Sequence, residues 1–518
     1  MTDSLVISKC GTCHARDDRG NMQRISWART TPEDWQDTVK QMILANGVFL
    51  TLPEARSIVR YLSSNHGLAP AEARPVMYDP ERRIQEETNI PSDGLRQDCA
   101  RCHAFARALE WRRSAGDWKE FAASHAARYK TRAAEEAVEF LVSAAPLRTP
   151  EWEAWRARKT APKLAGAWLV SAYLRGRGPF YGQMQIDDAG DDEYLTSADL
   201  RSVRDGSRIV RSGRGMLFGG YSWRGRSGGG PPPGSAPNDL RSEAREVMWF
   251  APDGSSAQGR WFWGQYQEFG FDVKLLRPTS APTLIALDPP SLRAGAQSSR
   301  IRMLGDRFPP EVAPADLRFG PDVTVRGVVS HTASEIVVEV DVASGSVSGK
   351  RDVALRDSTL PGGLAIYDRI DYVEMRPNST VASFADNTHP KGYQQFEAIG
   401  YQRGPDGRLH TADDLDLGPI DAMYSVEVFH AAEGSSSAFV GAMTPGGLFI
   451  PADKNPNNNF DCWVVATAKD ARGANGAPLV GKSYLVVTVP TYVFNGRRYV
   501  RDLDRWIDDG PARAANDR

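Results

Sequence analysis

Two short peptides near the start of the chain constrain its fold more than any other feature. They read Cys10-Gly11-Thr12-Cys13-His14 and Cys99-Ala100-Arg101-Cys102-His103. Both have the form Cys-x-x-Cys-His, the attachment sequence for a c-type haem. The two cysteines form thioether bonds to the porphyrin, and the adjacent histidine becomes the proximal ligand of the iron. The sequence therefore predicts two covalently bound haem c groups, which use four of the five cysteines in 518 residues. The residues assigned to them are Cys10, Cys13, Cys99 and Cys102 for the covalent bonds, and His14 and His103 for the irons.

Two other uses of Cys-x-x-Cys pairs stay open at this point. The four cysteines could bind zinc as thiolates, or each pair could be a thioredoxin-like redox pair. Neither use explains the histidine that follows the second cysteine in both peptides. The fifth cysteine, Cys462, stands alone in the sequence, and we expect a buried, inert thiol there.

Each haem motif is followed by the same helical pattern, so the first 150 residues contain an internal repeat. In the first half, Thr31 can cap a helix that carries Trp35 and ends near Gly47. In the second half, Ser114 can cap a helix that carries Trp118. A further amphipathic helix is expected in each half, over residues 53–62 and 134–141.

Met42 and His125 occupy equivalent positions in this repeat, each seven residues after its tryptophan. Methionine and histidine both serve as axial ligands of haem iron. The repeat therefore predicts Met42 as the sixth ligand of the first haem and His125 as that of the second. Met42 could instead be a core residue, and three other side chains compete for the first iron: Met22, His66 and Met77. Because methionine raises the reduction potential relative to a second imidazole, electrons are expected to pass from the second haem to the first.

The overall composition excludes several functional classes. Charged residues make up 25% of the chain and the net charge is −2, so there is no basic excess for nucleic acid. No run of about eighteen apolar residues could span a membrane. Because c-type haem is normally attached outside the cytoplasm, we expect a periplasmic protein whose export signal has been removed.

From about residue 161 the sequence changes to short runs of aromatic and β-branched residues separated by Gly/Pro-rich turns. Such closely spaced strands favour antiparallel barrels and sandwiches. No nucleophile elbow, P-loop or dinucleotide fingerprint occurs in a supporting context, so we expect scaffold and no catalytic residue here. The predicted architecture has four parts: a helical, tandem cytochrome c-type di-haem domain over 1–160 (units of about 1–70 and 71–160), an antiparallel β-barrel over 161–278, and two immunoglobulin-like sandwiches over 279–360 and 361–518.

This order of parts resembles the alpha subunit of quinohemoprotein amine dehydrogenases, and the resemblance covers nearly the whole chain. The Gly/Pro-rich residues 228–234 depart from the family pattern. The most specific matching segments are Cys10–His14, the Trp35/Met42 helix, Tyr61-Leu62, Gly67-Leu68-Ala69-Pro70, Glu81-Arg82-Arg83, Cys99–His103, the Trp118/His125 helix, Gly220-Tyr221-Ser222-Trp223-Arg224-Gly225 and Leu364-Ala365-Ile366-Tyr367-Asp368.

The resemblance implies a periplasmic heterotrimer. Its alpha subunit carries both haems, its beta subunit is a propeller, and its small gamma subunit bears a cysteine tryptophylquinone. The quinone oxidises a primary amine to an aldehyde and ammonia, and the electrons leave through the haems to an external cytochrome c or cupredoxin. By this resemblance the chain is the electron-transfer and scaffolding subunit of an amine dehydrogenase, and the quinone chemistry belongs to another subunit.

Two further interpretations remain open from the residues alone. A stand-alone di-haem peroxidase-type enzyme would need an exchangeable coordination site on one iron. A stand-alone electron carrier or sensor would use the sandwiches to bind a partner.

Overall fold

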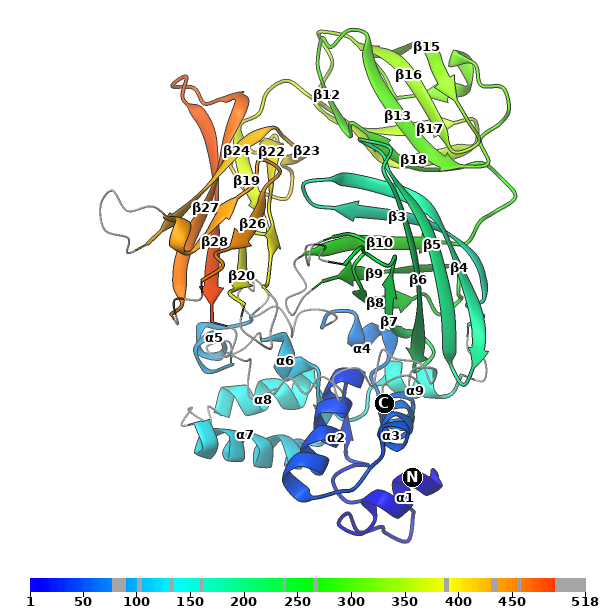
Figure 1. Cartoon of the computed structure of the whole chain (residues 1–518), viewed down its shortest axis with the longest axis vertical. Coiled ribbons are helices and arrows are strands. Elements are labelled where there is room, and N and C mark those ends of the chain that lie inside the picture. Colours follow the sequence, from blue (N-terminus) through cyan, green and yellow to red (C-terminus); the bar gives the residue numbers. More distant parts are fainter. Residues whose placement is uncertain are drawn as a thin grey trace.

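A computed structural model of the chain describes residues 1–76, 90–99, 105–129, 135–158, 162–233, 235, 239–263, 269–385, 391–429, 437–454, 456 and 458–489. The helices gather at one end of the molecule, and a closed barrel and two further β-domains lie beyond them (Figure 1). The fold is thus mostly β-structure with a helical N-terminal part.

The helical part is built from short helices whose ends follow the local sequence. Thr31 accepts a hydrogen bond from the backbone of Asp34, and Gly47 closes the same helix in the left-handed conformation at φ 70°. Ser114 caps its helix by accepting from the backbone of Asp117 at 3.1 Å. The elements are α1 (Ser4–Cys10), β1 (Ala28–Arg29), α2 (Pro32–Asn46), α3 (Leu52–Asn65), α4 (Pro70–Ala73), α5 (Asp93–Cys99), α6 (Ala106–Leu109), β2 (Arg112–Arg113), α7 (Ala115–Tyr129), α8 (Glu135–Ala144) and α9 (Pro150–Arg156).

Helices α2 and α3 form a first helix pair, and α7 and α8 form a second with equivalent internal hydrogen bonds. The indole Nε1 of Trp35 donates to the carbonyl of His66 at 2.9 Å, directly after α3. The indole Nε1 of Trp118 donates to the carbonyl of Ala145 at 2.8 Å, directly after α8. The same two carbonyls also accept from the backbone N–H groups of Thr30 and Arg113. The sequence repeat therefore corresponds to a structural repeat, in which equivalent residues of the two helix pairs make equivalent hydrogen bonds.

The two halves meet at a small antiparallel sheet in which Arg29 of β1 pairs with its repeat counterpart Arg112 of β2. Behind this sheet lies a buried carboxylate, Glu72, whose two oxygens each accept from Arg29 at 2.8 Å. Arg112 Nε lies 3.5 Å from Glu72, and the Thr149 hydroxyl donates to it at 2.7 Å. Burial alone would raise the pKa of Glu72, but the charge and hydrogen bonds of Arg29 lower it. We call these four side chains the Glu72 cluster.

The predicted antiparallel barrel is confirmed as a closed barrel of eight strands. Inward-facing side chains fill its interior, among them the fully buried indoles of Trp168, Trp223 and Trp261. Glycine is needed at Gly215, where a Cβ atom would lie 2.2 Å from the Trp223 ring. The strands are β3 (Gly166–Leu174), β4 (Gly178–Gly190), β5 (Glu193–Ser202), β6 (Arg208–Phe218), β7 (Ser222–Gly228), β8 (Ala244–Phe250), β9 (Ser256–Phe262) and β10 (Gly270–Leu276).

Two four-stranded sheets follow the barrel and share one hydrophobic core. Leu364 and Ile366 belong to this core, whereas the sequence analysis placed them at the start of the next domain. The strand that carries them therefore completes the first sandwich. The elements are β11 (Thr283–Asp288), β12 (Ser291–Arg293), β13 (Ser299–Asp306), η2 (Pro314–Asp316), β14 (Leu317–Arg318), β15 (Val323–His331), β16 (Glu335–Val342), β17 (Gly349–Leu355) and β18 (Ser358–Tyr367).

The last described part contains one four-stranded and two three-stranded sheets around another core. Cys462 is fully buried in that core. Burial raises the pKa of its thiol to about 12, which fits the inert thiol expected from the sequence. The elements are β19 (Tyr372–Arg376), β20 (Ser379–Ser383), β21 (Gln394–Gln395), β22 (Glu397–Gln402), β23 (Leu415–Pro419), β24 (Ala422–Val428), η3 (Ser437–Phe439), β25 (Gly441–Met443), β26 (Leu448–Pro451), β27 (Phe460–Arg472) and β28 (Pro478–Thr488).

Candidate functional site

The first Cys-x-x-Cys-His peptide begins at the last residue of α1. The backbone N–H groups of Cys13 and His14 both donate to the carbonyl of Cys10, at 3.2 and 2.9 Å, so the chain turns tightly here. Cys10 is half-buried and Cys13 is exposed. Burial raises the pKa of the Cys10 thiol, with smaller contributions from Asp3 and Cys13. One turn of chain therefore presents two thiols and an imidazole together.

The imidazole of His14 is held in one orientation by a backbone carbonyl. Its Nδ1 lies 2.9 Å from the oxygen of Gln23, and Gln23 in turn donates its N–H to the carbonyl of Ala15 at 2.9 Å. A carbonyl can only accept, so Nδ1 carries the proton and Nε2 keeps a lone pair. This is the arrangement of a histidine that binds a metal through Nε2, and His14 therefore fits a haem iron.

Apolar side chains next to this peptide are unusually exposed. The end of α2, the segment between α2 and α3 and the start of α3 contribute Leu44, Phe49 and Leu52, of which Phe49 is 80% exposed. This segment lies beside α1, because Lys9 at the end of α1 contacts the Phe49 carbonyl and pairs with Glu54 at 2.9 Å. Clustered exposed apolar residues mark binding surfaces, and a porphyrin is a large apolar plate.

Met42 lies on α2, on the side that is half-exposed. Its neighbour one turn along the helix, Asn46, points its amide Nδ2 at the Met42 sulfur at 3.6 Å. Ile43 of the same helix and Cys10 pack against one hydrophobic core with Trp35. The structure thus places the first motif and the Met42 helix around a common core.

The other candidates for the sixth ligand of the predicted first haem have different surroundings. Met22 is fully buried in the core of the first helix pair. His66 packs edge-on against Trp35, with ring centroids 6.5 Å apart. Burial, the N-terminal amine and two arginines lower the pKa of His66 to about 4. Met77 lies outside the described residues. Of the two described competitors, Met22 is buried, whereas His66 is partly exposed like Met42 and is distinguished by its contact with Trp35.

The second motif is described only at its first cysteine. Cys99 is the last residue of α5 and packs, half-buried, in a small core that includes Ala137 and Phe140. Cys102 and His103 lie outside the described residues. His125 lies on α7 between two aromatic rings, with centroid distances of 5.8 Å to Phe121 and 4.8 Å to Tyr129.

The environment of His125 favours a neutral imidazole. Burial lowers the pKa of His125. The two aromatic rings beside it are partly exposed, Phe121 at 42% and Tyr129 at 58%. An exposed aromatic face with a neutral histidine in its centre again fits a porphyrin. The same face of α7 also contacts a cation, because the Arg113 guanidinium lies 5.1 Å from the Phe121 ring.

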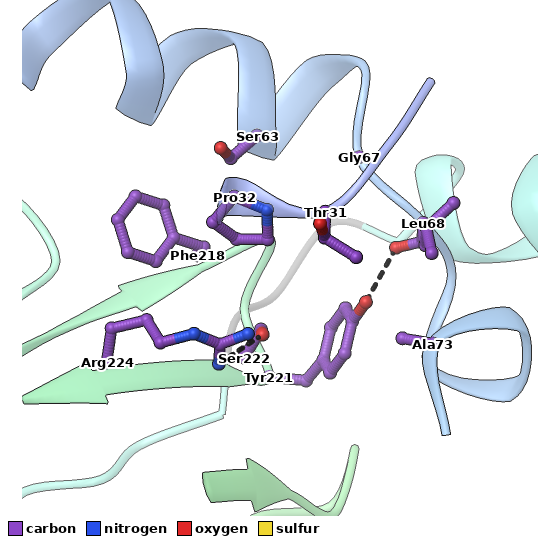
Figure 2. A pocket seen from close by; sticks show the side chains of 10 residues that line it. All are labelled: Thr31, Pro32, Ser63, Gly67, Leu68, Ala73, Phe218, Tyr221, Ser222 and Arg224. Carbon is purple, nitrogen blue, oxygen red and sulfur yellow. Dashed lines mark hydrogen bonds between the residues drawn. The ribbon is translucent and has the colours of Figure 1, made fainter. Parts of the chain in front are cut away.

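The first helix pair is fixed to the barrel by buried polar contacts. Arg224 on β7 pairs with Glu33 at the start of α2, with Nη2 to Oε2 at 3.0 Å. Burial alone would raise the pKa of Glu33, but the Arg224 guanidinium lowers it. The Tyr221 hydroxyl donates to the carbonyl of Leu68 at 2.9 Å, as Figure 2 shows. These contacts join the start of α2 and the residues after α3 to the barrel.

A small cavity lies in this junction between helices and barrel. Its volume is about 20 Å³, which is room for about one water molecule. Figure 2 shows side chains from the helical part and from the barrel around it, including Thr31, Ser63 and Arg224. The cavity is therefore not a substrate site.

Two residue groups at these sites were not found from the sequence. The Gln23 carbonyl gives no signal because it is a backbone atom. Arg224 was part of a segment that resembles family sequence, but nothing in the sequence linked it to Glu33. Within the described ranges, no group of three or more His, Cys, Asp and Glu side chains could hold a metal ion. In the same ranges, every helix is too short or too polar to span a membrane.

In the comparisons with known proteins, family models match four consecutive segments of the chain. A haem-binding model matches residues 1–139, and models of domains II, III and IV match residues 161–278, 281–368 and 373–496. All four describe parts of one kind of haem-binding oxidoreductase subunit. The chain belongs to the family of quinohemoprotein amine dehydrogenase alpha subunits.

Other comparisons add little. No curated protein matches the chain. A redesigned β-barrel is 13% identical and covers 22% of this chain and 92% of its own, with a TM-score of 0.18. Drosophila N-cadherin EC1-3 is 10% identical and covers 59% of this chain and 91% of its own, with a TM-score of 0.20. At TM-scores this low, neither similarity bears on fold or function.

Proposed function

We propose that this chain is the electron-transfer and scaffolding subunit of a periplasmic, heterotrimeric quinohemoprotein amine dehydrogenase. Its partners are a beta propeller subunit and a gamma subunit with a cysteine tryptophylquinone, where a primary amine becomes an aldehyde and ammonia. The chain passes the two released electrons to an external cytochrome c or cupredoxin. The observation that carries this proposal is the His14 imidazole, which presents Nε2 beside two thiols in a chain of this family.

The proposal assigns each cofactor contact to a residue of this chain. Cys10 and Cys13 form the thioether bonds of the first haem c, and Cys99 and Cys102 form those of the second. His14 and Met42 bind the first iron, and His103 and His125 bind the second. Bound haem supplies a reversible one-electron couple at each place.

The protein's part is to hold these ligands and tune them. The Gln23 carbonyl fixes the ring of His14 and makes its Nε2 a better donor. The thioether of Met42 raises the reduction potential relative to the imidazole of His125. This difference directs electrons from the second haem to the first. A lower measured potential at the Met42 site than at the His125 site would contradict that direction.

The first test uses the natively purified, oxidised complex without oxygen. Adding a primary amine such as butylamine or benzylamine should rapidly produce the absorption bands of reduced c-haem. Methanol of equal concentration serves as a control that cannot form an iminium with a quinone. No reduction, with both haems and all three subunits confirmed present, would contradict the amine dehydrogenase function and leave a di-haem carrier with another donor.

The ligand assignment has a separate test. Met42→Ala should convert the first haem from low spin to high spin, and His125→Ala should do the same to the second. Met22→Leu is the matched control for a buried methionine and should leave both spectra unchanged. A low-spin spectrum in either ligand variant would show that another residue binds that iron.

A further inference from the structure

The contact repeat extends one helical turn beyond the proposed ligands. Asn46 lies four residues after Met42, and Tyr129 lies four residues after His125. Residues four apart on a helix are neighbours on the same face. In both helices the structure shows the later side chain touching the earlier one. The two contacts are thus equivalent in the repeat, although they differ in chemistry.

The contact at the first site is a hydrogen bond to sulfur. Asn46 Nδ2 lies 3.6 Å from Met42 Sδ, within the range of an N–H donor and a weak thioether acceptor. A thioether sulfur has two lone pairs, so one can bind iron while the other accepts from Asn46. The hydrogen bond fixes which lone pair remains available, and it draws electron density away from sulfur.

The contact at the second site is between rings. The Tyr129 ring lies 4.8 Å from the His125 ring at an interplanar angle of 49°, and Phe121 lies on the other side at 5.8 Å and 38°. Phe121 itself is held by Trp118, with ring centroids 5.7 Å apart, and by Arg113. Such ring pairs have preferred geometries. The His125 plane is therefore limited from both sides, and Tyr129 is its neighbour at shorter distance.

We propose that Asn46 and Tyr129 are positioning residues, each of which orients the iron ligand four residues before it. This inference rests on the proposed function, because it takes Met42 and His125 as ligands. Asn46 selects the sulfur lone pair and weakens its donation, which stabilises the reduced iron. Tyr129 fixes the imidazole plane and slows its release from iron.

The first half of the test replaces Asn46 in the holoprotein complex. Asn46→Ala should lower the midpoint potential of the first haem and leave that of the second unchanged, because sulfur regains electron density. The matched control is Asn65→Ala, since Asn65 also contacts a residue four positions earlier, through the carbonyl of Tyr61 at 2.9 Å. Asn65→Ala should leave both potentials unchanged.

The second half replaces Tyr129. Tyr129→Ala should shift the low-spin EPR signal of the second haem and make its displacement by added cyanide several-fold faster. Tyr129→Phe keeps the ring and should behave as wild type. If Tyr129→Ala fails to retain haem, Tyr129→Leu supplies apolar bulk without a ring and is expected to show the same spectral shift.

The outcomes separate this inference from the function on which it rests. If Met42→Ala and His125→Ala become high spin, while Asn46→Ala and Tyr129→Ala match wild type in potential, EPR and cyanide kinetics, the positioning roles are wrong. If either ligand variant remains low spin, the ligand assignment fails first. Equal shifts in Asn46→Ala and Asn65→Ala would also overturn the role of Asn46.

Discussion

The first and second helix pairs share their internal contacts but differ in what surrounds them. The core of the first pair extends into the barrel through Met216 and Phe218, and the Glu33–Arg224 pair fixes its first helix. The core around Trp118 consists of side chains from residues 108–145. The difference shows that a sequence repeat can place equivalent side chains, while their support comes from elsewhere in the fold.

The largest expected effect concerns the Glu72 cluster, where the two halves meet. Glu72→Gln leaves the buried guanidinium of Arg29 without its carboxylate, and Arg112 loses the same charge. Removing one member of a buried ion pair costs about 3–5 kcal/mol. We expect a loss of this size in the free energy of unfolding, measured with denaturant on the holoprotein.

An exposed ion pair provides the matched control for this change. Glu427 lies 3.2 Å from Lys482, and both side chains are about half exposed. Glu427→Gln should cost less than about 1 kcal/mol, because water screens such pairs. Equal losses in the two variants would show that the Glu72 cluster does not join the halves.

The second prediction uses a residue that distinguishes the two helix pairs. His66 follows the second helix of the first pair, and Ala145 occupies the equivalent position in the second pair. Burial, followed by nearby positive charge, lowers the pKa of His66 from 6.5 to about 4, so the folded state favours the neutral ring. The unfolded state binds more protons below pH 6.5, and stability is therefore lost as pH falls from about 6.5 to about 4.

His66→Ala makes the first pair like the second and should remove this part of the pH dependence. The expected difference between wild type and variant is of the order of 2–3 kcal/mol between pH 7.5 and pH 4. Denaturant unfolding at several pH values measures it. A wild-type pH profile in the variant would mean that the His66 ring is not the titrating group.

The smallest expected effect concerns the equivalent indoles. Trp35→Phe and Trp118→Phe each remove one N–H donor and a little buried volume, and each should cost about 1–2 kcal/mol. Because both carbonyls keep a backbone donor, the two losses should agree closely. A cost more than about twice as large for Trp35 would show that contact with the barrel makes the first pair less able to relax.

Much of the helical part could be predicted from local sequence. Thr31, Gly47 and Ser114 act as caps as expected, because capping depends on a few neighbouring residues. The antiparallel barrel was also predicted, because closely spaced short strands favour barrels and sandwiches, and the structure shows that it is closed. One strand was assigned to the wrong side of a domain boundary, since Leu364 and Ile366 look alike in either core.

For the candidate sites, the sequence predicts the candidate ligands but not the groups that contact them. The Cys-x-x-Cys-His pattern predicts two cysteines and a histidine for each proposed haem, and the repeat predicts Met42 and His125 as the further ligands. The Gln23 carbonyl and the neighbours Asn46 and Tyr129 did not emerge, because their part depends on distances and not on residue type. Candidate ligands can thus be predicted from spacing, whereas the neighbours that contact them are found only in the structure.

The sequence by itself determined the two Cys-x-x-Cys-His peptides, the helix ends and the repeat, since each depends on residues close together in the chain. Only the tertiary structure decided that Arg29, Glu72 and Arg112 meet in one buried cluster and that Arg224 of the barrel neutralises Glu33 of the helices. Those partners are far apart in sequence, and burial makes their pairing necessary. The physical reason is that water solvates a charged side chain wherever it is exposed, whereas a buried charged side chain needs a partner of opposite charge.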